Sequence, residues 1–251
     1  MAEEGRAFEE LLKVMERLRR DCPWDREQTH ESLKKYLIEE AYELLDAIDE
    51  RDDRKLKEEL GDLLLQVVFH AQIAKERDAF GVKEVIDELI NKLIERHPHV
   101  FGSAKPEEAL KNWEKRKLEK RESVLEGIPK HLPALMRSQK IQEKLAQAGF
   151  TFPSDEELFS KIEEELKELK QALKRKNPKE LKHELGDLLT ALVELARRLG
   201  LDAEETLQEA NDRLIRRFSF VERKLKEQGR KPSEVSLEEL EALWREAKKS
   251  E

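Results

Sequence analysis

The sequence repeats itself at an offset of 125 residues, so that residues 33–68 align with residues 158–193 without a gap. Residues 56–64 and 181–189 are identical at every aligned position but one, and beyond them the register slips by four residues. A repeat of this length indicates a duplicated domain rather than a solenoid of short units. We therefore expect one domain in residues 1–126 and a second in residues 127–251, joined near Gly127-Ile128-Pro129.

Hydrophobic residues recur every three or four positions through both copies, which is the period of an α-helix with one buried face. No segment alternates polar and apolar residues convincingly, so the expected fold is all-α. Each copy contains a helical hairpin, with turn signals at Arg51-Asp52-Asp53 and at Asn177-Pro178. Further helices are expected at about 6–20, 82–97, 105–121, 134–147, 203–227 and 237–249.

Composition and charge exclude several classes of protein. The net charge of −8 does not favour nucleic acid or an anionic membrane as a partner. The N-terminal residues lack the features of a secretory signal, and no apolar run approaches the roughly 20 residues that span a bilayer. Cys22 is the single cysteine, which excludes an intrachain disulfide and fits a reducing, cytoplasmic location.

Four acids of the second copy share one flank of its hairpin. Because a helix advances about 100° per residue, Glu165 and Glu168 lie together beside the apolar stripe of their helix. Glu184 and Asp187 lie at the same angles on the following helix. Both pairs are spaced i, i+3, so each pair lies on a single face.

The acids also match in height, because residues equidistant from the turn of an antiparallel hairpin lie level. Counted from Lys176, the level pairs of the second copy are Glu168 with Glu184 and Glu165 with Asp187. Counted from Arg51, those of the first copy are Glu43 with Glu59 and Glu40 with Asp62. Four carboxylates crowded at one seam repel one another, and a bound divalent cation relieves that repulsion. All-oxygen ligands favour Mg²⁺, or Mn²⁺ as a substitute, over Zn²⁺.

A single Glu-x-x-Glu is common on solvated helices and carries no functional meaning by itself. Two level-matched pairs, repeated in both copies, favour a metal site. Gly61 and Gly186 add to this, because a glycine inside a helix costs about 1 kcal/mol relative to alanine. Its recurrence at the same place suggests close approach by another helix or a ligand.

The motifs around these acids resemble the MazG family of nucleoside triphosphate pyrophosphohydrolases. They are EEAYE and EELGD, preceded by CPWDREQTHESL and followed by ERHPHVF. The resemblance covers nearly the whole chain, including the tandem arrangement. It implies a four-helix-bundle fold for each domain and a homodimer built through those helices. It also implies Mg²⁺-dependent hydrolysis of nucleoside triphosphates to monophosphate and pyrophosphate.

The resemblance further implies roles for particular residues. The implied metal ligands are Glu40, Glu43, Glu59 and Asp62 in the first copy and Glu165, Glu168, Glu184 and Asp187 in the second. Glu39 and Glu164 are candidates to position or deprotonate the attacking water. The implied phosphate-binding cations, paired at i, i+4, are Lys92 and Arg96, and Arg213 and Arg217. Trp244 is similar to a family tryptophan that stacks on the base, with Trp113 and Lys115 or Lys117 as weaker first-copy counterparts.

The two copies are not equivalent. The second has QAGFTFPSD where the first has CPWDREQTH, and RRFSF where the first has RHPHV. Gln66 replaces the small Ala191 on the acidic flank. One site has therefore become mostly structural if the copies have diverged in function, and the sequence does not decide which.

Two other readings compete with the hydrolase. A di-iron carboxylate bundle needs two Glu-x-x-His motifs, whereas only Glu180-Leu-Lys-His183 fits and Glu58 replaces His183 in the first copy. A non-catalytic helical scaffold that binds a regulatory partner predicts acids without metal affinity. One stacking tryptophan predicts broad base tolerance, which fits a role in nucleotide-pool housekeeping or stress.

Overall fold

The computed structural model describes residues 2–103, 105 and 123–250, and every regular element in that part of the chain is a helix. The chain divides into two compact units, Met1–Lys115 and Arg116–Glu251, and each is described separately below. The prediction of an all-α duplicated fold is confirmed. The predicted boundary between residues 126 and 127 stays a prediction.

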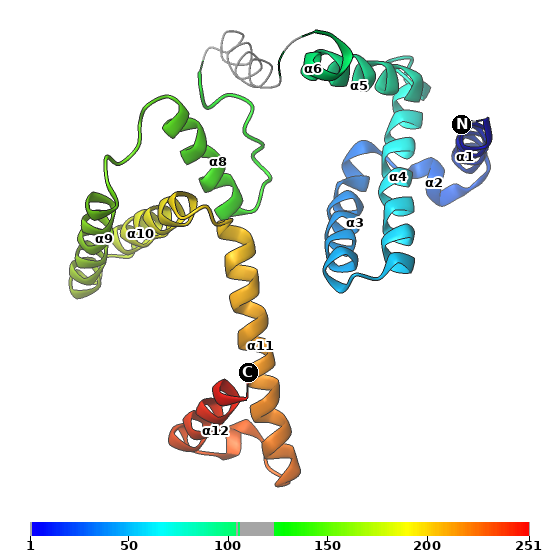
Figure 1. Cartoon of the computed structure of the whole chain (residues 1–251). Helices are drawn as coiled ribbons and strands as arrows, with labels where there is room; N and C mark the ends of the chain where they lie inside the picture. Colours follow the sequence, from blue (N-terminus) through cyan, green and yellow to red (C-terminus); the bar gives the residue numbers. More distant parts are fainter. Residues whose placement is uncertain (1, 104, 106–122, 251) are drawn as a thin grey trace. The chain divides into compact units, whose positions relative to one another are not determined.

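The first unit is built around a helical hairpin (Figure 1). Its helices are α1 Ala2–Asp21, α2 Pro23–Glu27, α3 His30–Glu50, α4 Asp53–Glu76, α5 Val82–Arg96 and α6 Pro98–Phe101. Helices α3 and α4 form the hairpin, and α1 packs on α4. The helix expected at about 105–121 falls almost entirely outside the described residues.

The second unit repeats the hairpin and extends it with a long helix (Figure 1). Its elements are α8 Ala134–Gln147, α9 Asp155–Arg175, α10 Pro178–Arg198, α11 Ala203–Glu227, the 3₁₀ turn Pro232–Glu234 and α12 Leu237–Lys249. Helices α9 and α10 form the hairpin, α8 packs on α10, and α12 packs on α11. Five of the separately predicted helices correspond to described helices with bounds that agree within four residues, namely α1, α5, α8, α11 and α12. In contrast, α2, α6 and the 3₁₀ turn were not predicted.

Both hairpins turn in the same way, which fixes the register of the helices that carry the acids. Arg51 and Lys176 end the first helix of each hairpin in the left-handed conformation, at φ values of 55° and 53°. Asp52 then caps α4 by accepting hydrogen bonds from the backbone amides of Arg54 and Lys55. Asn177 caps α10 in the same manner. The turns lie where the sequence predicted them.

The core of the first unit lies at the end of the hairpin away from this turn. Met15, Leu33, Val68, Phe69 and Ile73 form a buried cluster, and α1 supplies part of its cover. The His30 and His70 rings stack there, with 2.8 Å between their Nδ1 atoms, and join the start of α3 to α4. In the second unit Leu158, Val193, Val221 and Leu225 are buried. The hairpin ends nearest the turns therefore lie outside the main core.

An apolar stripe on each hairpin is left exposed. On α4 the residues Leu60, Leu64 and Val67 are 41–52% exposed. Their counterparts on α10 are Leu185, Leu189 and Leu192, which are 43–49% exposed. Among the described helices none combines the length and hydropathy that crossing a lipid bilayer requires.

Candidate metal centres

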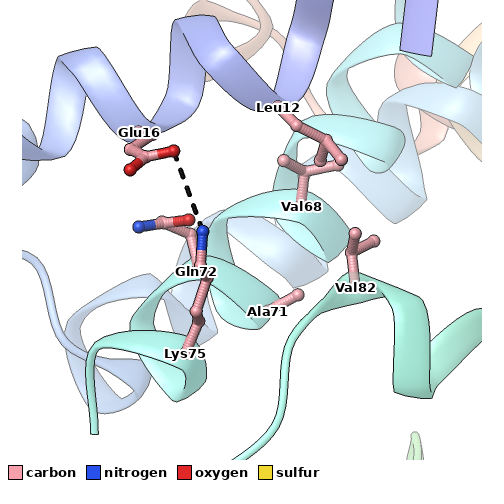
Figure 2. A pocket seen from close by; sticks show the side chains of 7 residues that line it. All are labelled: Leu12, Glu16, Val68, Ala71, Gln72, Lys75 and Val82. Atoms are coloured by element: carbon pink, nitrogen blue, oxygen red, sulfur yellow. Dashed lines mark ion pairs between the residues drawn. The ribbon is translucent and has the colours of Figure 1, made fainter. Parts of the chain in front are cut away.

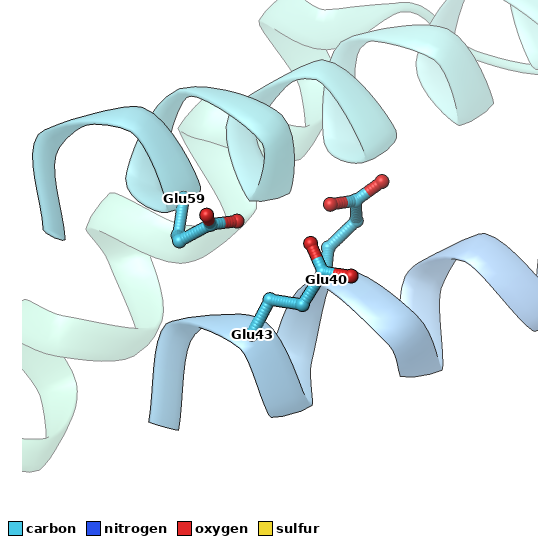
Figure 3. A group of neighbouring side chains, drawn as sticks. All are labelled: Glu40, Glu43 and Glu59. Atoms are coloured by element: carbon cyan, nitrogen blue, oxygen red, sulfur yellow. The ribbon is translucent and has the colours of Figure 1, made fainter. Parts of the chain in front are cut away.

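Three carboxylates of the first unit converge between the two helices of its hairpin. Glu40 and Glu43 extend from α3 and Glu59 from α4, and Figure 3 shows them directed into the space between the helices. Each offers an oxygen atom that lies within 4.8 Å of the others. The level arrangement predicted from the register thus brings acids of both helices to one place.

The second unit contains a corresponding group in the same register. Glu165 of α9 and Glu184 and Asp187 of α10 each offer an oxygen within 4.8 Å of the others. The fourth predicted acid lies outside this distance in each unit, and it is Asp62 in the first and Glu168 in the second. Each hairpin therefore gathers three of its four predicted acids, but not the same three.

The acids that lie outside the two close groups, Asp62 and Glu168, still raise the pKa values of cluster members. Burial raises the pKa of Glu40 above its ordinary value, and the charge of Asp62 is the next largest cause. Burial also raises the pKa of Glu59, followed by the charges of Glu43 and Asp62. The like charges therefore oppose full ionisation of the first cluster.

The second cluster also contains a carboxylate with a raised pKa. Burial raises the pKa of Glu184, and the charge of Glu168 is the next largest cause. Each cluster also contains one buried carboxylate oxygen without a hydrogen-bond partner among the described residues, the Oε2 atom of Glu59 and the Oε2 atom of Glu165. Unpartnered carboxylate oxygens in a crowded, partly desolvated site are donors that a hard divalent cation satisfies.

A lysine distinguishes the two clusters. The Lys161 ammonium lies 2.8 Å from the Glu165 carboxylate and 3.1 Å from Glu164, and Glu165 is only 5% exposed. These hydrogen bonds, first that to Glu165 and then that to Glu164, raise the pKa of Lys161 well above its ordinary value. The first unit has Tyr36 at the aligned position. The sequence reasoning missed Lys161, although its spacing of four residues from Glu165 was a visible signal.

The two acids proposed to handle water differ in their surroundings. Glu39 is exposed on α3 beside Glu40. Glu164 is exposed on α9 and accepts a hydrogen bond from Lys161. Both lie next to a cluster member in sequence and on the solvent side of their helix.

The predicted phosphate-binding residues lie on helices other than those of the acids. Lys92 and Arg96 are exposed on α5. On α11, Arg213 forms an ion pair with Glu209 at 3.6 Å, and the Arg217 guanidinium lies 5.9 Å from the centre of the Trp244 ring on α12. Arg217 and Trp244 are thus neighbours, as one binding element would require. Trp113, Lys115 and Lys117 lie outside the described residues.

Hollows elsewhere in the molecule are separate from the acids. Figure 2 shows a small cavity of about 60 Å³ between α1, α4 and the start of α5, where Lys75 and Glu16 lie 3.7 Å apart. A larger one of about 370 Å³ lies between α11 and the end of α12, beside Arg216, Arg217 and Arg223. Neither of these two hollows is lined by the acids of the clusters.

The glycines inside the two hairpins have free space around them. A Cβ atom added at Gly61 or Gly186 meets nothing within 4 Å, so no described part of the same chain approaches either glycine. The close approach expected from the sequence therefore has no partner among the described residues.

Known proteins with similar sequences extend over the whole chain. The description "MazG nucleotide pyrophosphohydrolase domain" matches residues 28–101 and 154–221, which contain both hairpins. The nucleoside triphosphate pyrophosphohydrolase/pyrophosphatase MazG of Thermotoga maritima is 49% identical and covers 99% of this chain and 98% of its own length. The nucleoside triphosphate pyrophosphohydrolase of Escherichia coli strain K12 is 43% identical, with coverages of 97% and 98%.

A solved structure of a mazG-related protein from Thermotoga maritima is 33% identical over 44% of this chain and 98% of that one, with a TM-score of 0.40. The two domain matches and the full-length relatives are sufficient: the chain belongs to the MazG nucleotide pyrophosphohydrolase family, with two MazG domains in tandem.

Proposed function

We propose that this protein hydrolyses nucleoside triphosphates between the α- and β-phosphates, giving a nucleoside monophosphate and pyrophosphate, with Mg²⁺ as the required cation. The observation that carries the proposal is the recurrence, in both units, of three converging carboxylates that include a buried unpartnered oxygen. The names of the full-length relatives support the reaction class.

The carboxylates fit a hard divalent cation, for which Mn²⁺ is an expected substitute. Glu40, Glu43 and Glu59 would hold it in the first unit, and the charge of Asp62 acts on the same cluster. In the second unit Glu165, Glu184 and Asp187 would hold it, and the charge of Glu168 acts on the same cluster. A bound Mg²⁺ supplies charge neutralisation for the phosphates and makes water more acidic.

The remaining proposed residues act on the water and the leaving group. Glu39 or Glu164 positions a water molecule and takes its proton as the water oxygen forms a bond to the α-phosphorus. The bridging bond from the α-phosphorus to the oxygen of the β-phosphate then breaks, and pyrophosphate leaves. The charge on that pyrophosphate is held by cations, which we propose to be Lys92 and Arg96 in one unit and Arg213 and Arg217 in the other.

We also propose that two copies associate through the hairpins. The exposed stripes on α4 and α10 are apolar, and Gly61 and Gly186 leave room for a close helix on the same hairpins. A second hairpin packed there completes a four-helix bundle and removes the apolar surface from water. Arg217 and Trp244 lie on the α11–α12 pair, away from the acids of α9 and α10 in sequence, so association also offers a second source for the substrate-binding part of the site.

Base recognition by a stacking Trp244 predicts tolerance of different bases, and we propose a housekeeping or stress role in the nucleotide pool. A cytoplasmic setting fits both the substrate and the single free Cys22.

The test is incubation of the full chain with each triphosphate and Mg²⁺, followed by separation of the products. Monophosphate with pyrophosphate is expected, whereas diphosphate with phosphate contradicts cleavage at the proposed bond. Paired variants, Glu43→Gln with Glu59→Gln and Glu168→Gln with Glu184→Gln, then show which unit acts. Unchanged turnover in both paired variants and in their combination refutes the assignment of the site and leaves a scaffold as the better account.

A further inference from the structure

Gln66 on α4 is a buried amide with an unsatisfied acceptor. It is only 5% exposed, and its Oε1 atom has no hydrogen-bond partner among the described residues. Leaving such an atom unpaired is costly, so a native structure usually retains one for a reason. Gln142 of the second unit is also buried and its Oε1 atom likewise has no hydrogen-bond partner among the described residues, but its Nε2 atom donates to the Thr190 carbonyl at 2.8 Å and so joins two helices.

The position of Gln66 relates it to the acid cluster. Glu59, Asp62 and Gln66 are spaced i, i+3 and i+7, so they lie in one row along α4, and the row continues into the core at Phe69. Gln66 lies about 6 Å along the helix beyond Asp62. A triphosphate held at the acids places its sugar and base at a similar distance from its α-phosphate. By register, the amide therefore lies about one helical turn beyond the acids, at the height that the nucleoside of such a triphosphate would reach.

The residue that faces Gln66 from the neighbouring helix also differs between the two units. The register that pairs Glu40 with Asp62 places Tyr36 of α3 opposite Gln66, and the Tyr36 ring is partly buried against the same core. Trp24 meets that ring edge-on at 6.1 Å and is 52% exposed. The second unit has Lys161 and Ala191 at these two places. One unit therefore presents an amide and aromatic rings beyond its acids, whereas the other presents a methyl group and a cation that is already bound to Glu165.

We propose that Gln66 accepts a hydrogen bond from the nucleoside portion of the triphosphate and thereby determines which nucleotides the first unit selects. The inference rests on the proposed hydrolase function and assigns its selectivity to one unit. The unsatisfied atom is an acceptor, so its ligand must be a donor, either a sugar hydroxyl or an amino group of the base. The second unit, with Ala191, lacks this contact and is expected to discriminate less.

The experiment uses the full chain with the second cluster inactivated by Glu168→Gln and Glu184→Gln. In this background, kcat/KM and the Kd for Mg²⁺-loaded ATP, dATP and ITP are compared between Gln66 and Gln66→Ala. ATP against dATP tests the sugar hydroxyl, and ATP against ITP tests the amino group. We expect Gln66 to favour the nucleotide with the donor by about 5–30-fold, and Gln66→Ala to remove most of that preference.

A matched control separates selectivity from folding. Gln142→Ala removes a buried amide of the second unit that also has an unpaired Oε1 atom but whose Nε2 atom joins two helices, and it should lower the melting temperature while leaving the ratios among the three nucleotides unchanged. Gln66→Ala introduces the residue that the aligned position of the second unit already carries, and its melting temperature and circular dichroism show whether the fold is retained.

The outcomes are distinct. If the unmodified protein hydrolyses no triphosphate, the proposed function fails. If it does, but the Gln66 and Gln66→Ala proteins give the same ratios among the three nucleotides, only the role of Gln66 is overturned. Loss of both binding and turnover when the second cluster alone is inactivated also overturns it, because the first unit would then not be a nucleotide site.

Discussion

Replacement of Lys161 by methionine tests whether the second cluster carries an internal cation. The change keeps the length of the side chain and removes its charge, which leaves Glu165 buried without its partner. Without a divalent cation, we expect the Lys161→Met protein to be less stable than the wild type. We expect Mg²⁺ to stabilise the variant more than the wild type, because the Glu165 carboxylate becomes available to the metal.

The magnitude follows from the geometry of the pair. At 2.8 Å, and with an effective dielectric constant near 20, two unit charges attract by about 6 kcal/mol. Desolvation of Glu165, whose side chain is 6% exposed, offsets much of this attraction, and the 37% exposure of Lys161 lets solvent screen it further. A net loss of about 1–3 kcal/mol remains, because the variant retains a buried carboxylate without its ion pair. For a unit of this size the midpoint should fall by roughly 3–10 °C.

The assay is thermal unfolding of the full chain in EDTA and in Mg²⁺. The double variant Lys161→Met with Glu165→Gln is the control, since a neutral amide no longer needs the lysine and should recover part of the loss. Two results would refute the reasoning. One is a Lys161→Met protein that is as stable in EDTA as the wild type. The other is a double variant whose loss of stability equals the sum of the losses caused by Lys161→Met and Glu165→Gln alone.

Three other predictions follow from the same structure. The pKa values of Glu40, Glu59 and Glu184 are raised in the folded protein, so their contribution to stability is fully present below the ordinary value of 4.5 and is lost as the pH rises through the folded pKa values. Calorimetry in EDTA should therefore show that the double variant Glu59→Gln with Glu184→Gln stabilises the protein more at neutral pH than at pH 4.5. An equal effect at both pH values contradicts this. Leu225 is 0% exposed, so Leu225→Ala should lower the free energy of unfolding by about 2–5 kcal/mol in a denaturant titration. Leu214 on the same helix is 55% exposed, so Leu214→Ala should lower it far less. Equal losses would contradict the burial of α11 described above. Leu60→Glu with Leu185→Glu places charges on both exposed stripes and should convert a dimer to a monomer in light scattering without loss of helicity, whereas an unchanged mass would place the interface elsewhere.

The parts of the structure that the sequence predicted depend on local spacing. The period of apolar residues defines the hairpin helices, and Asp52 and Asn177 are typical caps, so the two turns and the register followed directly. Once the register is known, acids at equal distances from the turn must lie level. That is why the sequence anticipated that Glu43 and Glu59, or Glu165 and Asp187, would lie together.

The parts that were not predicted depend on side-chain direction and on packing between distant segments. Spacing does not decide which carboxylate turns inward, so Asp62 and Glu168 fall outside the close groups. The ion pair of Lys161 became meaningful only when Glu165 was found buried. The stacking of His30 on His70 joins residues 40 apart in the chain, and no local pattern encodes it. The unsatisfied Oε1 of Gln66 is likewise visible only in three dimensions.

The most direct test of the central claim is a titration of the full chain with Mn²⁺, followed by electron paramagnetic resonance of the free ion. The account predicts that the protein binds Mn²⁺, that Mg²⁺ displaces it, and that the combined change of Glu43, Glu59, Glu168 and Glu184 to glutamine abolishes this binding while the helical circular dichroism is retained. Equal Mn²⁺ binding by the wild-type protein and this variant would show that the converging carboxylates do not hold the metal, and would contradict the account.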